Sequence, residues 1–283
     1  MKQILLLLSL LLSGLSFPGC SPDVEITPAF VTLDGFDLQT PTIGAATSDI
    51  TEVWVFADDD YIGAFPLPAR IPVLKAGATT MQFIPGVRQN GVTATPDIYP
   101  FYSEVVRTLD LRPAETIALG TPTIGYKPEA RFSINEGFEA GFPREFTIRV
   151  FGDTIILPSQ DRVLSGQFSG KIPLTADAPL LEMSSTETFS DLLANSPSVW
   201  LEVDFLSDAF INWGVTGFDG QRPIRNFDPI TRPRTEWTKI YFNLTEIVVR
   251  SNLDEINLNF SALLPDGVTS GDVYLDNIKL IHF

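Results

Sequence analysis

The sequence predicts an all-β protein made of two β-sandwich domains in series. Short stretches that alternate apolar and polar residues recur along the chain, and β-branched and aromatic residues are frequent in them. The 283 residues include 20 Gly and 22 Pro, which is typical of many short strands joined by tight turns. Almost no stretch shows the apolar periodicity of a helix. Together these observations favour sandwiches over any helical or mixed fold.

The first domain is predicted over residues 27–126. Alternation marks a strand at 50–56, and the acidic triplet 58–60 predicts a turn into a hairpin partner at 61–65. Prolines in 67–74 place that stretch at a sheet edge, because proline lacks the amide hydrogen that a central strand needs. Further strands are expected at 79–84, 103–109 and 117–119.

A fixed order of strands and turns runs through positions 50–84. An Asp turn follows the first strand, and Tyr61-Ile62-Gly63, a Pro-rich edge and the turn Ala76-Gly77-Ala78 come before the next strand. This order resembles small surface-associated β-sandwiches of the PEGA-like or immunoglobulin-like type, and the resemblance implies a spacer domain. Pro and Gly are concentrated at 121–129, so we place a linker at 127–130.

The second domain is predicted over residues 131–283. It opens on Gly137-Phe138-Glu139 and nearly closes on Leu275-Asp276-Asn277. These two ends resemble those of carbohydrate-binding-module jelly rolls with the galactose-binding-like fold. About eight strands over this length suit a jelly roll. The strands between the two ends are expected at 146–151, 162–172, 199–205, 209–218, 237–244 and 255–260.

The same resemblance implies a structural calcium ion where the first and last strands of the jelly roll meet. Glu139 and Asp276 match the ligand positions, and carboxylate and carbonyl oxygens are the ligands that calcium prefers. The alternative is that Asp276 caps a strand end and that Glu139 is solvated.

A ligand-binding region is predicted between Trp213 and Trp237. A sugar site needs an aromatic face for the apolar side of a pyranose ring, together with hydrogen-bonding side chains. We expect a long polar loop at 219–234, which holds four arginines in an otherwise acidic chain. Arginine beside aromatic residues also suits a protein interface, and core packing is the alternative for each Trp. The candidate binding residues are Trp213, Phe218, Gln221, Arg222, Arg225 and Trp237.

The first twenty residues form a secretion signal. Lys2 precedes a Leu-rich run at 4–12 that is too short for a membrane span, and Cys20 is the only cysteine of the chain. The end of the signal, Phe17-Pro18-Gly19-Cys20, resembles a bacterial lipoprotein box in its last two positions and departs from it in the first two. The resemblance implies a Cys20 that carries lipid, palmitate included. An ordinary secretory signal with a coincidental cysteine is the alternative.

The lipoprotein resemblance also implies a cell-envelope location. The acidic tether 21–26 resembles those of surface-exposed, outer-membrane lipoproteins of Bacteroidetes-type bacteria. The formal net charge of −16 repels phosphate backbones, so nucleic acid is not an expected partner. The expected partners are a membrane, through the lipid, and a glycan or an envelope protein.

The residue inventory disfavours catalysis. His282 is the only histidine, so a Ser-His-Asp arrangement has little to draw on, and zinc would lack its usual His and Cys ligands. Paired carboxylates for glycoside hydrolysis stay open, since such a pair is spatial and not sequential. We therefore expect a non-catalytic binding module with no certain cofactor beyond calcium. A structural accessory subunit of an outer-membrane complex is the second hypothesis, and a glycosidase is the third.

Overall fold

The computed structural model describes residues 27–40 and 46–283, and its described part is almost entirely β-strand with one short helix. The all-β class predicted from the sequence is confirmed. The predicted signal 1–20 with Cys20 and the tether 21–26 lie outside the described residues. Within the described ranges, the chain has no helix with the length and apolar character required to cross a bilayer.

The N-terminal unit, defined here as β1 to β10, pairs its strands into three sheets. The largest has the order β4-β3-β6-β7 with β8 beside β6 on the same edge as β7, and the second has the order β5-β1-β9. Strands β2 and β10 form a short parallel pair. The strands are β1 (Ala29–Leu33), β2 (Asp37–Leu38), β3 (Glu52–Ala57), β4 (Asp60–Pro66), β5 (Ala69–Val73), β6 (Gly77–Arg88), β7 (Pro96–Ile98), β8 (Val105–Leu111), β9 (Thr116–Ala118) and β10 (Thr123–Ile124).

The predicted hairpin in this unit forms as the sequence indicates. Asp58 and Asp59 both adopt left-handed φ angles, of 47° and 67°, which suits a tight turn between two antiparallel strands. Strand β3 then alternates, with Val53 and Val55 fully buried in the core. The Pro-containing strand β5 lies at the edge of its sheet, as proline requires.

The C-terminal unit, defined here as β11 to β21 with α2, packs two sheets face to face. One sheet has the order β13-β14-β21-β16-β19 with β11 beside β21, and the other has the order β12-β15-β20-β17-β18. The elements are β11 (Arg131–Glu136), β12 (Ile148–Phe151), β13 (Leu157–Ser159), β14 (Ser169–Thr175), β15 (Leu180–Ser184), β16 (Val199–Ser207), β17 (Phe210–Phe218), β18 (Pro223–Thr231), β19 (Arg234–Asn243), α2 (Thr245–Ser251), β20 (Ile256–Leu263) and β21 (Ser270–His282).

Three elements of this unit differ from the sequence prediction. The expected strand at 162–172 begins only at Ser169, because the residues before it form an irregular loop. The expected polar loop 219–234 contains strand β18, which tolerates its prolines because it is an edge strand. Helix α2 was not predicted, since seven residues are too few to show helical periodicity.

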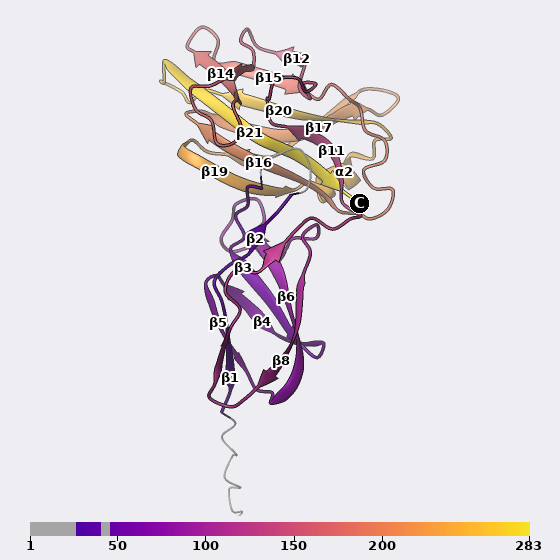
Figure 1. The fold of residues 1–283 in the computed structure, drawn as a ribbon. Helices are drawn as coiled ribbons and strands as arrows, with labels where there is room; N and C mark the ends of the chain where they lie inside the picture. The colour runs from indigo at the N-terminus through magenta and orange to yellow at the C-terminus, as the bar shows by residue number, and fades with distance from the viewer. Residues whose placement is uncertain (1–26, 41–45) are drawn as a thin grey trace, which may run out of the picture.

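The two units share a continuous apolar core at their junction. Trp200, Tyr241 and Ile281 come from β16, β19 and β21, yet they belong to the same cluster of buried side chains as the core of the N-terminal unit. Tyr99 packs edge-on against Trp200, with ring centroids 5.3 Å apart, and against Tyr241 at 5.0 Å. The N-terminal unit therefore covers the side of the β16–β19–β21 sheet that points away from the core of the C-terminal sandwich (Figure 1).

Candidate functional site

The sheet β12-β15-β20-β17-β18 packs on the core side of the sheet that holds β16, β19 and β21, whose opposite side contacts the N-terminal unit through Trp200, Tyr241 and Ile281. Along β17, Ile211, Trp213 and Val215 point into the sandwich core, so the alternate residues point outward. We call the outward side of this sheet the outer face. Strand register places on it Ile148, Phe151, Glu182, Ser184, Thr216, Phe218, Arg225, Phe227, Asn257 and Asn259.

An ion pair crosses the middle of the outer face. Arg225 on edge strand β18 donates to both carboxylate oxygens of Glu182 on β15. Strands β20 and β17 lie between them, so the two side chains span three strand spacings, roughly 14 Å. The Glu182 side chain is only 8% exposed and that of Arg225 is 49% exposed. The guanidinium is thus held in place by a shielded carboxylate and still presents donors to solvent.

Hydroxyl and amide side chains lie next to this ion pair on the outer face, and we call them together with the pair the polar strip. Thr216 and Ser184 donate from their hydroxyls to Asn259 Oδ1, at 2.7 and 3.3 Å. Gly214 leaves room for Phe227, because a Cβ atom at position 214 would lie 2.9 Å from its Cγ. The middle of the outer face is therefore a fixed set of donors and acceptors.

Exposed apolar side chains border the polar strip on two sides. Phe151 on edge strand β12 is 62% exposed, and Phe218 at the end of β17 is 60% exposed. Ile148 lies beside Phe151 on the same strand and is exposed too. A central polar strip between accessible aromatic rings presents both kinds of contact that a sugar chain uses.

The structure separates the six candidate binding residues into different places. Arg225 and Phe218 lie on the outer face. Gln221 and Arg222 lie at the exposed β17–β18 turn, where their backbone amides donate to Asp219 Oδ1. Trp237 is half-buried on β19, in the other sheet, and lines a groove of about 570 Å³ at the junction of the two units.

Trp213 is a core residue and offers no ring face to a ligand. Its side chain is 1% exposed and packs against Phe260 and Phe146, with ring centroids 5.3 and 6.4 Å away. It points to the inner side of β17, opposite to the outer face. The binding role predicted for Trp213 is wrong because the pleat of the strand turns its ring inward.

Glu139 and Asp276, for which the sequence predicted a calcium site, both contact the loop before β14, and the calcium site itself stays a prediction. Glu139 Oε1 accepts the backbone amides of Gln167 and Phe168, and Asp276 Oδ2 accepts that of Ser165 at 3.2 Å. No set of three or more acidic, His or Cys side chains converges among residues 27–40 and 46–283 in a way that would hold a metal ion. The two carboxylates anchor the loop before β14.

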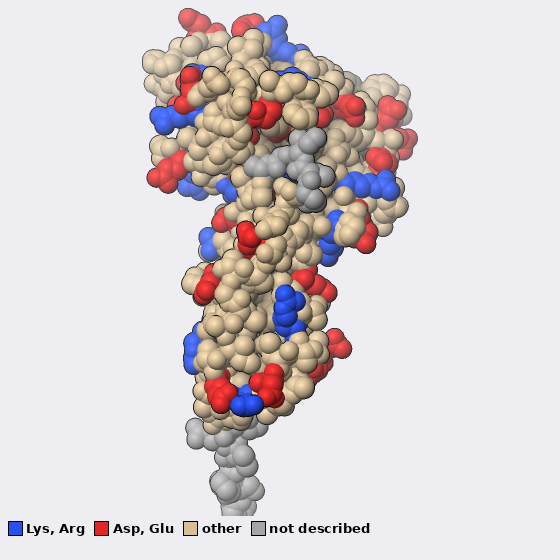
Figure 2. Space-filling model, viewed as in Figure 1, with Lys and Arg blue, Asp and Glu red and all other residues tan. Residues whose placement is uncertain are grey.

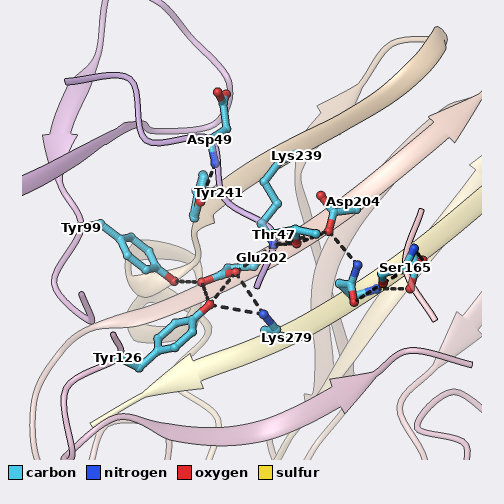
Figure 3. Close-up of polar contacts among 12 residues, drawn as sticks. Thr47, Asp49, Tyr99, Tyr126, Ser165, Glu202, Asp204, Lys239, Tyr241 and Lys279 are labelled. Atoms are coloured by element: carbon cyan, nitrogen blue, oxygen red, sulfur yellow. Dashed lines mark hydrogen bonds and ion pairs between the residues drawn. The ribbon is translucent and has the colours of Figure 1, made fainter. Parts of the chain in front are cut away.

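A buried charge cluster at the junction was not predicted. Glu202 on β16 is fully buried and 2.9 Å from Lys239 Nζ on β19, and 3.8 Å from Lys279 Nζ on β21. Tyr99 of the N-terminal unit and Tyr126 of the segment between β10 and β11 donate to Glu202 Oε1, at 2.7 and 2.8 Å (Figure 3). The only sequence signal was the presence of charged residues within the three strands β16, β19 and β21.

Burial and the neighbouring lysine charges have opposite effects on the pKa of Glu202. Burial on its own raises the pKa of Glu202, but the ammonium groups of Lys239 and Lys279 outweigh it and lower the pKa below its usual range. Burial lowers the pKa of Lys279 to about 8, and the neighbouring Lys239 charge adds to that effect. Burial also raises the pKa of Tyr99 and Tyr126, so both phenols stay protonated donors. The cluster is a structural joint between the units.

No protein-family model matches the chain, and no curated protein is similar to it. Similar solved structures include a structure of carbohydrate-binding modules from the β-sandwich superfamily, with a TM-score of 0.41 and 13% identity, covering 90% of this chain and 98% of the other.

Two further structures match about half of the chain. The family 22 xylan-binding domain of Paenibacillus barcinonensis Xyn10C has a TM-score of 0.36 and 12% identity, over 53% of this chain and 94% of its own. The family 30 carbohydrate-binding module of a Clostridium thermocellum cellulosomal cellulase has a TM-score of 0.37 and 14% identity, over 49% and 94%. At these low scores, the ligand of this chain has to be inferred from its own residues.

Proposed function

We propose that this protein is a non-catalytic binding module that holds a glycan on the outer face of its C-terminal unit. The observation that supports the proposal is the Glu182–Arg225 pair, which crosses an open sheet face between the exposed rings of Phe151 and Phe218. Sugar hydroxyls pair well with fixed charged and amide groups, and the apolar side of a pyranose ring packs on aromatic surface.

A glycan array followed by calorimetric titration of the best ligand tests this proposal. We expect Phe218→Ala and Phe151→Ala each to weaken binding by about tenfold, which corresponds to about 1.4 kcal/mol. Both rings are exposed, so the melting temperature should stay at the wild-type value. Tyr61→Ala is the matched control, since Tyr61 is a 54% exposed aromatic residue of the N-terminal unit.

Two outcomes would count against the glycan. Unchanged affinity in both Phe variants would remove the outer face as the site. No binding to any glycan, with a stoichiometric envelope protein copurifying after mild detergent extraction, would favour the accessory-subunit hypothesis instead.

We also propose that a lipid on Cys20 anchors the protein in the outer membrane. The signal-like residues 1–20 and the single cysteine support this location. Strand β1 lies in the part of the N-terminal unit remote from the C-terminal unit (Figure 1), so an anchor near it would hold the outer face away from the membrane. Intact mass and membrane fractionation of wild type and Cys20→Ala test the anchor. A soluble wild type with an unmodified cysteine would refute it.

A further inference from the structure

A second pocket lies at the junction of the two units, apart from the outer face. It has a volume of about 320 Å³, and residues from both units line it. That volume lies at the lower end of the range for small-molecule sites, so it suits one or two sugar rings more than a protein surface. The pocket adjoins the groove that contains Trp237, because Asp49, Thr238 and Lys239 line both.

Three arginines line this pocket in a chain that has 35 acidic and 19 basic residues. Arg232 and Arg234 flank the short connection from β18 to β19, and Arg88 ends β6 of the N-terminal unit. Arg88 is 3.4 Å from Glu52. Arg232 and Arg234 are exposed and make no ion pair within the part of the chain that the structure describes. Figure 2 shows basic side chains on both flanks at the height of the junction.

The opposing charges of the pocket are few. Asp49 is the one carboxylate among the described residues that line it, and it lies at the border with the neighbouring groove. Lys239 also lines the pocket, but Glu202 and Asp204 neutralise it at 2.9 and 3.6 Å. The two unpaired guanidinium groups therefore set a positive potential there.

Neutral hydrogen-bonding groups lie beside the arginines. Asn90 has a left-handed φ of 56°, and its backbone amide donates to the backbone carbonyl of Tyr241 at 2.8 Å. Its Oδ1 accepts the amide of Asn243 at 3.2 Å, so the side chain is fixed from the other unit. Thr231 and Thr238 add hydroxyl groups to the lining. Polar groups of this kind bind sugar hydroxyls as well as a charged substituent.

We propose that this junction pocket binds an acidic saccharide through its carboxylate or sulfate group. Guanidinium groups match such oxyanions with two parallel hydrogen bonds, and Arg232 and Arg234 are free to form them. Asn90 and Thr238 would bind hydroxyls of the same sugar ring. The junction pocket is distinct from the outer face, so this proposal can be correct or wrong independently of the proposed function.

Calorimetric titration of the full chain tests the pocket. The probes are tetragalacturonate and a sulfated galactan oligosaccharide, each beside its neutral counterpart, the methyl ester and the desulfated chain. We expect at least one acidic probe to bind about tenfold more tightly than its neutral counterpart at low ionic strength, and less tightly as salt is added. Arg232→Gln with Arg234→Gln should reduce that binding by about tenfold, and Asp49→Asn should strengthen it.

The matched control is Arg107→Gln with Arg112→Gln, which changes the net charge equally at two exposed positions of the N-terminal unit. It should leave the affinity unchanged. Equal binding of acidic and neutral probes, or an unaffected Arg232→Gln/Arg234→Gln variant, would overturn the proposal. Binding of inorganic sulfate as tight as that of the oligosaccharides would mean an adventitious ion only. The Phe218→Ala variant should bind the acidic probes with wild-type affinity, even if it loses binding on the outer face.

Discussion

Replacing Glu202 with glutamine should lower the free energy of unfolding by about 3–5 kcal/mol, the range for breaking a buried ion pair from one side. The substitution keeps the shape of the side chain but removes the carboxylate charge that lies 2.9 Å from Lys239 Nζ and 3.8 Å from Lys279 Nζ, while both ammonium groups stay buried. It also weakens the hydrogen bonds from Tyr99 and Tyr126, which join the two units. The expected result is a less stable protein whose units separate more easily.

Urea unfolding followed by tryptophan fluorescence and circular dichroism measures this change. Glu246→Gln is the control, because Glu246 forms an exposed pair with Arg250 on α2 and should change stability by no more than about 0.5 kcal/mol. A Glu202→Gln variant as stable as this control would show that the buried cluster does not hold the junction together.

The pH dependence gives a second readout of the same substitution. The pKa of Glu202 is lower in the folded protein than its ordinary value of 4.5, so the unfolded chain binds the proton more readily. Its stabilising contribution is therefore present above about pH 4.5 and is lost as the pH falls through the lowered pKa. The stability gap between wild type and Glu202→Gln should narrow on acidification. A gap that stays constant down to the acid transition would contradict the pairing.

The sequence predicted the strands and turns better than the surfaces. The hairpin at β3–β4 was predictable because Asp58 and Asp59 suit left-handed turn positions and the flanking strands alternate. Strand β18 was not, because its prolines and charged residues are typical of a loop, and they are tolerated only because β18 is an edge strand. That misassignment concealed the outer face, since Arg225 reaches Glu182 only from a paired β18.

The junction was beyond sequence reasoning for a different reason. Glu202, Lys239 and Lys279 are 37 or more residues apart in the chain, and the register of the neighbouring strands β19, β16 and β21 brings their charges together. Nothing local to Lys239 distinguishes it from a solvated strand residue. Arg232 and Arg234 belong to the arginine-rich stretch seen in the sequence, but only the packing of the two units places them in one pocket with Arg88.

Replacing Trp213 with alanine should destabilise the C-terminal unit by about 3–5 kcal/mol, the usual cost of removing a large buried aromatic side chain. The ring is among the largest fully buried side chains and fills the space beside Phe146 and Phe260, so its loss leaves a cavity between the two sheets. Thermal and urea unfolding measure the change, and Trp237→Ala is the control because that ring is only half-buried.

Binding measurements on a Trp213→Phe variant then separate packing from recognition. Phenylalanine keeps most of the buried apolar surface, so this variant should fold and bind ligand on the outer face with wild-type affinity. A folded Trp213→Phe variant that lost its ligand would mean that the indole takes part in recognition, against the burial seen in the structure. The Trp213 ring packs on the core side of β17, and Phe218 projects from the same strand on the outer face. Substitutions at Trp213 should therefore change the stability, and substitutions at Phe218 should change the affinity.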